Sequence, residues 1–141
     1  MLFEATNLSV AYTGSLPHIP FTALKEKVLG KRYVLSIAFV TPARARRLNY
    51  TYRRKRYTPN TLSFALDTLH GEIVLCRKVL RSQYKKFDMT YETYLTYILI
   101  HSMLHLKGMT HGSTMERKEK ELLTLFTPLR RSNETNNNRR H

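Results

Sequence analysis

The 141-residue chain is poor in cysteine, in acidic side chains and in long apolar runs. Cys76 is its one cysteine, so no internal disulfide can form, which fits a reducing compartment. No apolar run approaches the roughly 18 residues of a membrane-spanning helix. The N-terminal sequence MLFEATNLSV lacks the basic segment and the apolar stretch of a secretory signal. We therefore expect a cytoplasmic protein with no membrane segment, and we expect Cys76 to be buried in the apolar run 73–76.

The shortage of acidic residues leaves a large and uneven positive charge. Asp and Glu number 10 against 24 Lys and Arg, which gives a formal net charge of +14, and residues 27–66 contain no acidic residue. Within that window, residues 44–57 (RARRLNYTYRRKRY) interleave arginines and tyrosines, which can pair with phosphates and stack on bases. Such a run is often only a solvated surface, but its one-sided excess favours contact with nucleic acid. The candidate contact residues are Arg44, Arg46, Arg47, Arg54, Lys55 and Arg56.

Hydrophobic patterning predicts a single domain at residues 1–128, followed by a disordered polar tail at 129–141. Apolar spacing, caps and turn residues predict an edge strand at 2–10, helices at 21–29, 43–52, 78–86, 91–107 and 115–126, and strands at 33–40, 61–66 and 72–76. This order predicts an α/β fold of the α+β type, in which helices cover one small mixed sheet. The largely apolar segment 91–107 is expected to be the central buried helix.

A cluster of histidines lies at the end of this predicted central helix. His101 and His105 are four residues apart, which places both rings on one helical face, about 5–6 Å apart at Cβ. Gly108 permits a turn that can bring His111 back to the same point. Three neutral ligands and one open position are typical of a catalytic metal site. A pair of histidines at this spacing is common by chance, and the third histidine after a glycine is what favours a metal.

The residue after the first histidine excludes one kind of metalloenzyme. Zinc proteases of the HExxH type have a glutamate there, which acts as the general base. This chain has Ser102, which has no basicity to offer. Hydrolysis would then depend on the metal and on a cation that stabilises the developing negative charge.

Residues 101–111 (HSMLHLKGMTH) resemble the signature HGxLHLxGYDH of the YbeY family, metal-dependent endoribonucleases of rRNA maturation. Upstream, residues 48–53 (LNYTYR) resemble the family's LNxxYR, and residues 60–64 (NTLSF) resemble its T-[DN]-V-L-S-F strand. Residues 71–73 (GEI) are similar to its G-[DE]-I strand start. These motifs, found in the same order as in the family, are together much more specific than three histidines alone.

The chain departs from the signature at Ser102, Met109 and Thr110. The family has an aspartate at the position of Thr110, beside the last histidine, where it could orient a ligand or the metal's water. None of the three departures removes a histidine.

The resemblance implies an α/β fold with a metal at the bottom of a cleft between the central helix and the sheet. It implies that His101, His105 and His111 bind one Zn²⁺ ion per chain and that Arg53 is the functional arginine across the cleft. The implied activity is single-strand-specific cleavage of RNA, in the maturation of small-subunit (16S) rRNA and in ribosome quality control. The implied partners are rRNA or its precursors and the ribosome or ribosomal proteins.

Two alternatives stay open at this point. The protein could be a ribosome-binding assembly factor whose metal holds the helix turn together, or a metallohydrolase of another substrate, including peptides. The metal could also be nickel, manganese or iron, since imidazole suits several first-row ions.

Overall fold

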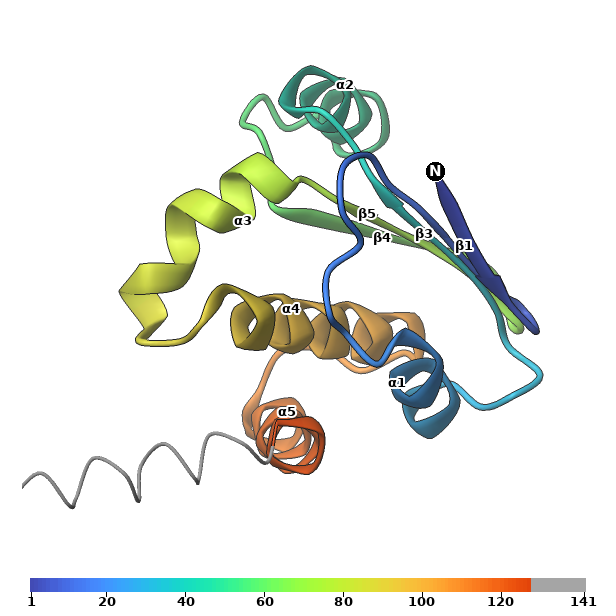
Figure 1. Ribbon diagram of the computed structural model, residues 1–141. Coiled ribbons are helices and arrows are strands. Elements are labelled where there is room, and N and C mark those ends of the chain that lie inside the picture. The colour runs from blue at the N-terminus through green and yellow to red at the C-terminus, as the bar shows by residue number, and fades with distance from the viewer. Residues whose placement is uncertain (128–141) are drawn as a thin grey trace, which may run out of the picture.

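The computed structural model describes residues 1–127 and has a five-stranded mixed sheet with helices packed around it (Figure 1). The strands are β1 (Leu2–Ala5), β2 (Leu8–Ala11), β3 (Val34–Phe39), β4 (Thr61–Asp67) and β5 (His70–Leu75). Their order in the sheet is β1-β2-β3-β5-β4. The inner strands β2, β3 and β5 are parallel, and each edge strand is antiparallel to its neighbour. The predicted fold class is therefore confirmed.

The prediction of one edge strand at residues 2–10 was wrong, because this segment is a hairpin of two strands. Between β1 and β2 the chain turns at Asn7, which has a left-handed backbone (φ 58°), a conformation that asparagine tolerates better than most residues. The Asn7 side-chain amide donates to the carbonyl of Lys31, 3.1 Å away, and so ties the turn to the start of β3. Of the two strands of this hairpin, β1 lies at an edge of the sheet, whereas β2 pairs with β3 inside the sheet.

The helices agree with the predicted segments, with two adjustments. They are α1 (Phe21–Val28), α2 (Pro42–Arg53), α3 (Arg77–Gln83), α4 (Tyr91–Leu106) and α5 (Ser113–Phe126). The segment predicted as one helix at 78–86 is α3 followed by the 3₁₀-helix η1 (Tyr84–Phe87), and the helix predicted to start at 115 begins two residues earlier. Threonine side chains cap α2 and α4, as Thr41 and Thr90 accept hydrogen bonds from Arg44 N and Thr93 N.

Helix α4 packs between the sheet and the outer helices. In Figure 1 it lies along one face of the sheet, with α5 on its far side, whereas α2 lies beyond the other face. Its buried side chains include Leu95, Leu99, Ile100 and Met103, which are fully shielded from solvent. Because α4 is surrounded, its apolar residues point in all directions. This places the C-terminal turns of α4, where two of the histidines lie, beside strand β4.

Other expectations can be compared with residues 1–127. Cys76 is buried directly after β5, which confirms the prediction for that residue. Within the described part of the chain, no helix is both long enough and apolar enough to cross a membrane. The predicted polar tail at 129–141 lies outside the described residues.

Candidate active site

The three histidines are brought together by one helix and the turn that follows it. His101 and His105 lie on the same face of α4, and the helix ends where Gly108 adopts a left-handed backbone (φ 103°). The turn is closed by hydrogen bonds from Gly108 N to His105 O and from Met109 N to Leu104 O. His111 thereby returns to the helix, and one ring nitrogen from each histidine lies within 4.8 Å of the others. The predicted cluster is thus present, with the atoms that a metal ion requires.

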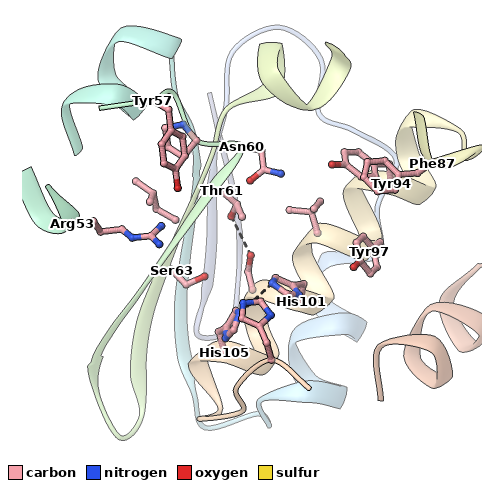
Figure 2. A pocket seen from close by; sticks show the side chains of 15 residues that line it. Arg53, Tyr57, Asn60, Thr61, Ser63, Phe87, Tyr94, Tyr97, His101 and His105 are labelled. Atoms are coloured by element: carbon pink, nitrogen blue, oxygen red, sulfur yellow. Dashed lines mark hydrogen bonds between the residues drawn. The ribbon is translucent and has the colours of Figure 1, made fainter. Parts of the chain in front are cut away.

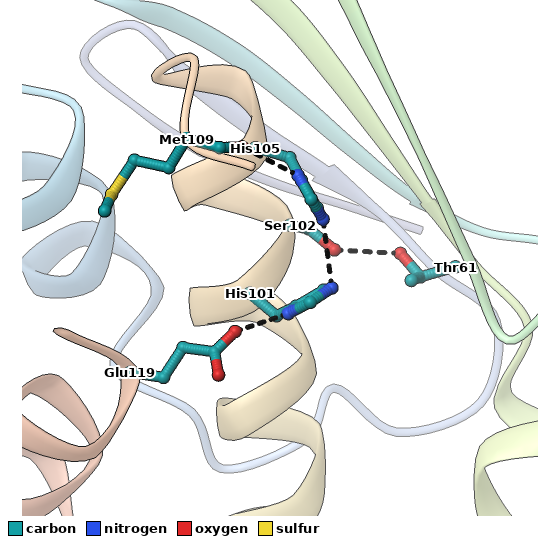
Figure 3. A network of polar contacts seen from close by, with 6 residues as sticks. All are labelled: Thr61, His101, Ser102, His105, Met109 and Glu119. Atoms are coloured by element: carbon teal, nitrogen blue, oxygen red, sulfur yellow. Dashed lines mark hydrogen bonds and ion pairs between the residues drawn. The ribbon is translucent and has the colours of Figure 1, made fainter. Parts of the chain in front are cut away.

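Hydrogen bonds fix which ring nitrogens face one another (Figure 3). The Nδ1–H of His105 donates to the carbonyl of Met109, 3.0 Å away, and the Nδ1–H of His101 donates to the carboxylate of Glu119. With both Nδ1 atoms protonated, the two Nε2 atoms carry lone pairs in neutral rings. These Nε2 atoms are 3.1 Å apart. When both rings are neutral, the two lone pairs face one another at this distance, and a shared metal ion would relieve their repulsion.

This spacing fits the geometry of a metal site. Two nitrogens at metal bonds of 2.0–2.1 Å in a tetrahedral site are about 3.3 Å apart. The pKa of His105 is lowered, mainly because burial penalises the charged ring, and the neighbouring histidines lower it further. A lowered pKa keeps the ring neutral at physiological pH, and the neutral ring is the form that binds a metal. The donor set is therefore suited to a first-row ion.

Glu119 is a site residue that the sequence interpretation missed. It lies on α5, 18 residues from His101, and its side chain is buried against that histidine. Its neighbours on the same helical face, Met115 and Leu122, belong to the hydrophobic core. A glutamate on the apolar face of an amphipathic helix was the available signal, because a buried carboxylate needs a partner. Here the partner is a ring that a metal ion would bind.

Ser102 connects α4, the helix that carries His101 and His105, to the sheet. It is fully buried, and its Oγ lies 3.1 Å from Oγ1 of Thr61 at the start of β4. The position at which HExxH proteases have a general base is therefore used for a contact between α4 and β4. This contact sets the distance between the histidines and the opposite wall of the cleft.

The histidines lie at one end of a cleft with a volume of about 670 Å³ (Figure 2). One wall is formed by the end of α2, the loop after it and strand β4, which contribute Arg53, Tyr57 and Thr61. The other wall is formed by η1 and α4. Among the described residues that line the cleft, none is Asp or Glu. The cleft can therefore accept an anion without repulsion from its own walls.

Arg53 is the last residue of α2, and Figure 2 shows its side chain pointing into the cleft. The helix ends there because Arg54 adopts a left-handed backbone (φ 58°). The following loop is held by Asn49, a fully buried residue whose Nδ2 donates to the carbonyl of Tyr57 at 3.0 Å. The sheet lies between α2 and α4, so Arg53 reaches the cleft past the edge strand β4.

The other basic residues of the 44–57 segment do not line this cleft. The six predicted contact residues are all exposed on α2 or on the loop after it: Arg44, Arg46, Arg47, Arg54, Lys55 and Arg56. Two guanidinium groups flank one tyrosine ring, since those of Arg54 and Arg56 lie 5.4 Å and 5.0 Å from the centre of Tyr50. Their contact with RNA stays a prediction.

The fold and the site define a class of protein: a small α/β protein with a three-histidine cluster in a cleft that has no acidic lining among its described residues. Comparison with known proteins narrows this class. The family model for Endoribonuclease YbeY matches residues 10–127, and the chain belongs to this family of endoribonucleases.

Individual relatives agree with this assignment. Endoribonuclease YbeY of Bdellovibrio bacteriovorus is 37% identical over 113 residues, which cover 74% of this chain and 71% of that protein. The enzyme of the same name from Polynucleobacter asymbioticus is 28% identical over 131 residues, covering 87% and 84%. The solution structure of TM1509 from Thermotoga maritima has the same fold, with a TM-score of 0.56 at 22% identity, covering 88% of this chain and 93% of that one.

Proposed function

We propose that this protein is a single-strand-specific, metal-dependent endoribonuclease that acts in the cytoplasm on 16S rRNA precursors and in ribosome quality control. One zinc ion per chain would be held by His101, His105 and His111. The observation that carries the proposal is that these histidines and Arg53 line one cleft in a chain of an endoribonuclease family. The partners are then RNA and the ribosome or its proteins.

The choice of zinc rests on the donor set. Three imidazoles with a fourth position left open are a common ligand set of catalytic zinc. When bound there, the ion supplies Lewis acidity toward a phosphate oxygen and lowers the pKa of water. Glu119 and the Met109 carbonyl hold the rings of His101 and His105 in the orientation that presents Nε2.

Arg53 is suited to bind the phosphate that is cleaved. A planar guanidinium donates two parallel hydrogen bonds to phosphate oxygens and stays charged at any physiological pH. Its hydrogen bonds strengthen as charge builds up on those oxygens in the transition state, which is what accelerates the reaction. We propose that Arg53 binds the scissile phosphate from the wall opposite the histidines. The exposed arginines of α2 would attract the strand at longer range.

The proposal is tested by the His105→Ala variant, which removes one of three ligands. We expect purified wild-type protein to contain metal and to cleave single-stranded RNA, and the variant to lose both. The wild-type protein after chelator treatment and dialysis serves as a control for the metal. Cleavage that persists at the wild-type rate in chelator-treated His105→Ala protein would contradict the proposal.

A second candidate function is favoured by the lack of an acidic residue among the described residues of the cleft, which leaves no carboxylate to act as general base. The protein would then be an assembly factor that docks on the ribosome, with a structural metal. A His101→Ala protein that folds normally and still supports rRNA processing in a deletion strain would favour docking over cleavage. Peptide hydrolysis is disfavoured, because Ser102 is buried against Thr61 and offers no base.

A further inference from the structure

The helical wall of the cleft presents a row of aromatic rings that ends at the histidines. We call the side chains of Phe87, Tyr94 and Tyr97 the aromatic wall (Figure 2). The ring centres of Phe87 and Tyr94 are 4.9 Å apart and those of Tyr94 and Tyr97 are 6.4 Å apart. The next step, from Tyr97 to His101, is 6.2 Å. The row thus leads from the outer rim of the cleft to the metal ligands.

Phe87 differs from the rest of the row because it is exposed. Tyr94 is 2% exposed and belongs to the core, whereas Phe87 is 50% exposed on the short helix η1. The two rings are stacked nearly parallel, at 19°, so Tyr94 covers one face of Phe87. The exposed remainder of Phe87 borders the cleft. A half-exposed phenyl ring at the rim of a cleft is a surface to which a flat ligand can bind.

The ring beneath Phe87 is fixed before any ligand arrives. The hydroxyl of Tyr94 donates to Oε1 of Gln83 at 3.0 Å, and Asn60 donates to the same oxygen at 3.2 Å. Gln83 immediately precedes η1 and Asn60 immediately precedes β4, so this network connects the two walls of the cleft. A rigid platform loses little conformational entropy when a ligand stacks on it.

The charges around Phe87 favour a polyanion. Lys85 and Lys86 are exposed next to it on η1, and Arg53 points into the cleft from the other wall. Asp88, which follows Phe87, is exposed as well, and none of Lys85, Lys86 and Asp88 lines the cleft. An exposed aromatic ring that shares a cleft with an arginine and follows two exposed lysines in the sequence has the composition of a site for single-stranded nucleic acid.

We propose that Phe87 is a stacking platform for one unpaired nucleobase of the RNA strand whose phosphate lies at the histidines. The inference rests on the proposed function and adds a binding subsite to it. His101 and Tyr94 are seven residues apart on α4, about 10 Å along the helix axis. The stacked base therefore belongs to a nucleotide near the scissile phosphate and not to the scissile linkage itself. In a duplex both faces of each base are already stacked on neighbouring bases, so the platform selects single strands.

The absence of tryptophan from the chain permits a direct test. In a Phe87→Trp variant the only indole lies at the proposed platform. Stopped-flow mixing with a single-stranded RNA oligonucleotide should quench its fluorescence before cleavage, whereas a fully paired duplex of the same sequence should not. A Leu125→Trp variant is the matched control, because Leu125 is 55% exposed on α5 and does not line the cleft. Its fluorescence should not respond to RNA.

Two truncations separate stacking from simple apolar contact. Phe87→Ala removes the ring, and Phe87→Leu keeps apolar bulk without a flat face. Both variants should raise KM for single-stranded RNA by about 10-fold, the range for losing one stacked base, with kcat changed less than about 2-fold. Replacing one nucleotide of the RNA at a time by an abasic ribose should reveal a position that costs wild-type protein about 10-fold and costs Phe87→Ala nothing.

The outcomes distinguish the platform from the proposed function. The stacking proposal is wrong if Phe87→Leu cleaves RNA with the wild-type KM, or if the fluorescence of the indole at position 87 is not quenched while RNA is cleaved. Either result would leave the proposed endoribonuclease function intact. If wild-type protein neither binds nor cleaves RNA, the proposed function fails and the platform falls with it. Circular dichroism and metal content establish that each variant is folded.

Discussion

At the scale of single residues, the site depends on Glu119 as well as on the three histidines. Its carboxylate accepts the Nδ1–H of His101, which directs the Nε2 lone pair of that ring toward His105. A carboxylate in this position also makes the imidazole a stronger ligand. We therefore propose that Glu119 is a positioning residue, which would act on a bound metal through His101.

We expect Glu119→Gln to lower the affinity for zinc by about 10- to 100-fold, because the amide cannot supply the negative charge. Competition with a chelating dye measures this change without any assay of activity. Glu121→Gln is the matched control, since Glu121 is exposed on the same helix. Equal zinc affinity in both variants would show that Glu119 is only a buried contact.

Arg53 gives a second prediction at this scale. Arg53→Lys keeps the charge but loses the paired donors, and we expect kcat to fall by about 100-fold, in the range for losing one donor to a developing oxyanion. Metal content should stay at the wild-type value, because Arg53 lies across the cleft from the histidines. Arg117→Lys is the matched control, as Arg117 is exposed on α5 and does not line the cleft. A similar kcat for both variants would show that Arg53 has no role in the reaction.

At the scale of the elements, the position of α4 against the sheet determines the shape of the cleft. Gly71 in β5 lies beneath the end of α4, and a Cβ at this position would clash with the hydroxyl of Tyr33 and approach Leu106 at 3.1 Å. A side chain there would displace the Tyr33 ring, and Leu106 in the last turn of α4 would have to give way by a few tenths of an ångström. The last turn contains His105, so the effect reaches the site.

We therefore expect Gly71→Ala to lower the free energy of unfolding by about 1–3 kcal/mol, the usual cost of overpacking a core. Urea denaturation measures the loss. Ser36→Ala on the exposed side of β3 is a control that leaves the contact with α4 intact. Wild-type stability in Gly71→Ala would mean that α4 and β5 are not packed as closely as described.

The sequence predicted what depends on local spacing. The apolar pattern of α4, the four-residue step from His101 to His105 and the turn at Gly108 are all local, and they suffice to predict the cluster. Position across the cleft is not local. Arg53 could be placed there only through the resemblance to a family. The sequence of residues 48–53 does not determine whether the end of α2 lies near the cleft.

Glu119 and the aromatic wall were missed for the same reason. The rotation of α5 about its own axis decides whether Glu119 faces His101 or solvent, and that rotation is set by packing. Likewise, Phe87 reaches the cleft because the chain tightens into η1 after α3, where the sequence suggested one continuous helix. The hairpin at Asn7 was also overlooked, since a weakly alternating run does not reveal a two-residue turn.

At the scale of the whole molecule, the chain has a net charge of +14, and its cleft has no acidic residue among the described residues that line it. Such an excess of positive charge attracts any polyanion, so it would favour RNA binding but would not by itself produce cleavage. In our proposal, cleavage requires the three histidines and Arg53, which line the same cleft. The central claim is therefore that the histidine cluster is a catalytic metal centre.

Titration of metal-free protein with Zn²⁺ tests this claim most directly. Cleavage of a single-stranded RNA should be absent at first, rise in proportion to added zinc and stop rising at about one equivalent per chain, as expected for one three-histidine site. His111→Ala, taken through the same titration, should show no rise. Full cleavage by the metal-free protein, or a rise that the His111→Ala variant reproduces, would contradict the claim.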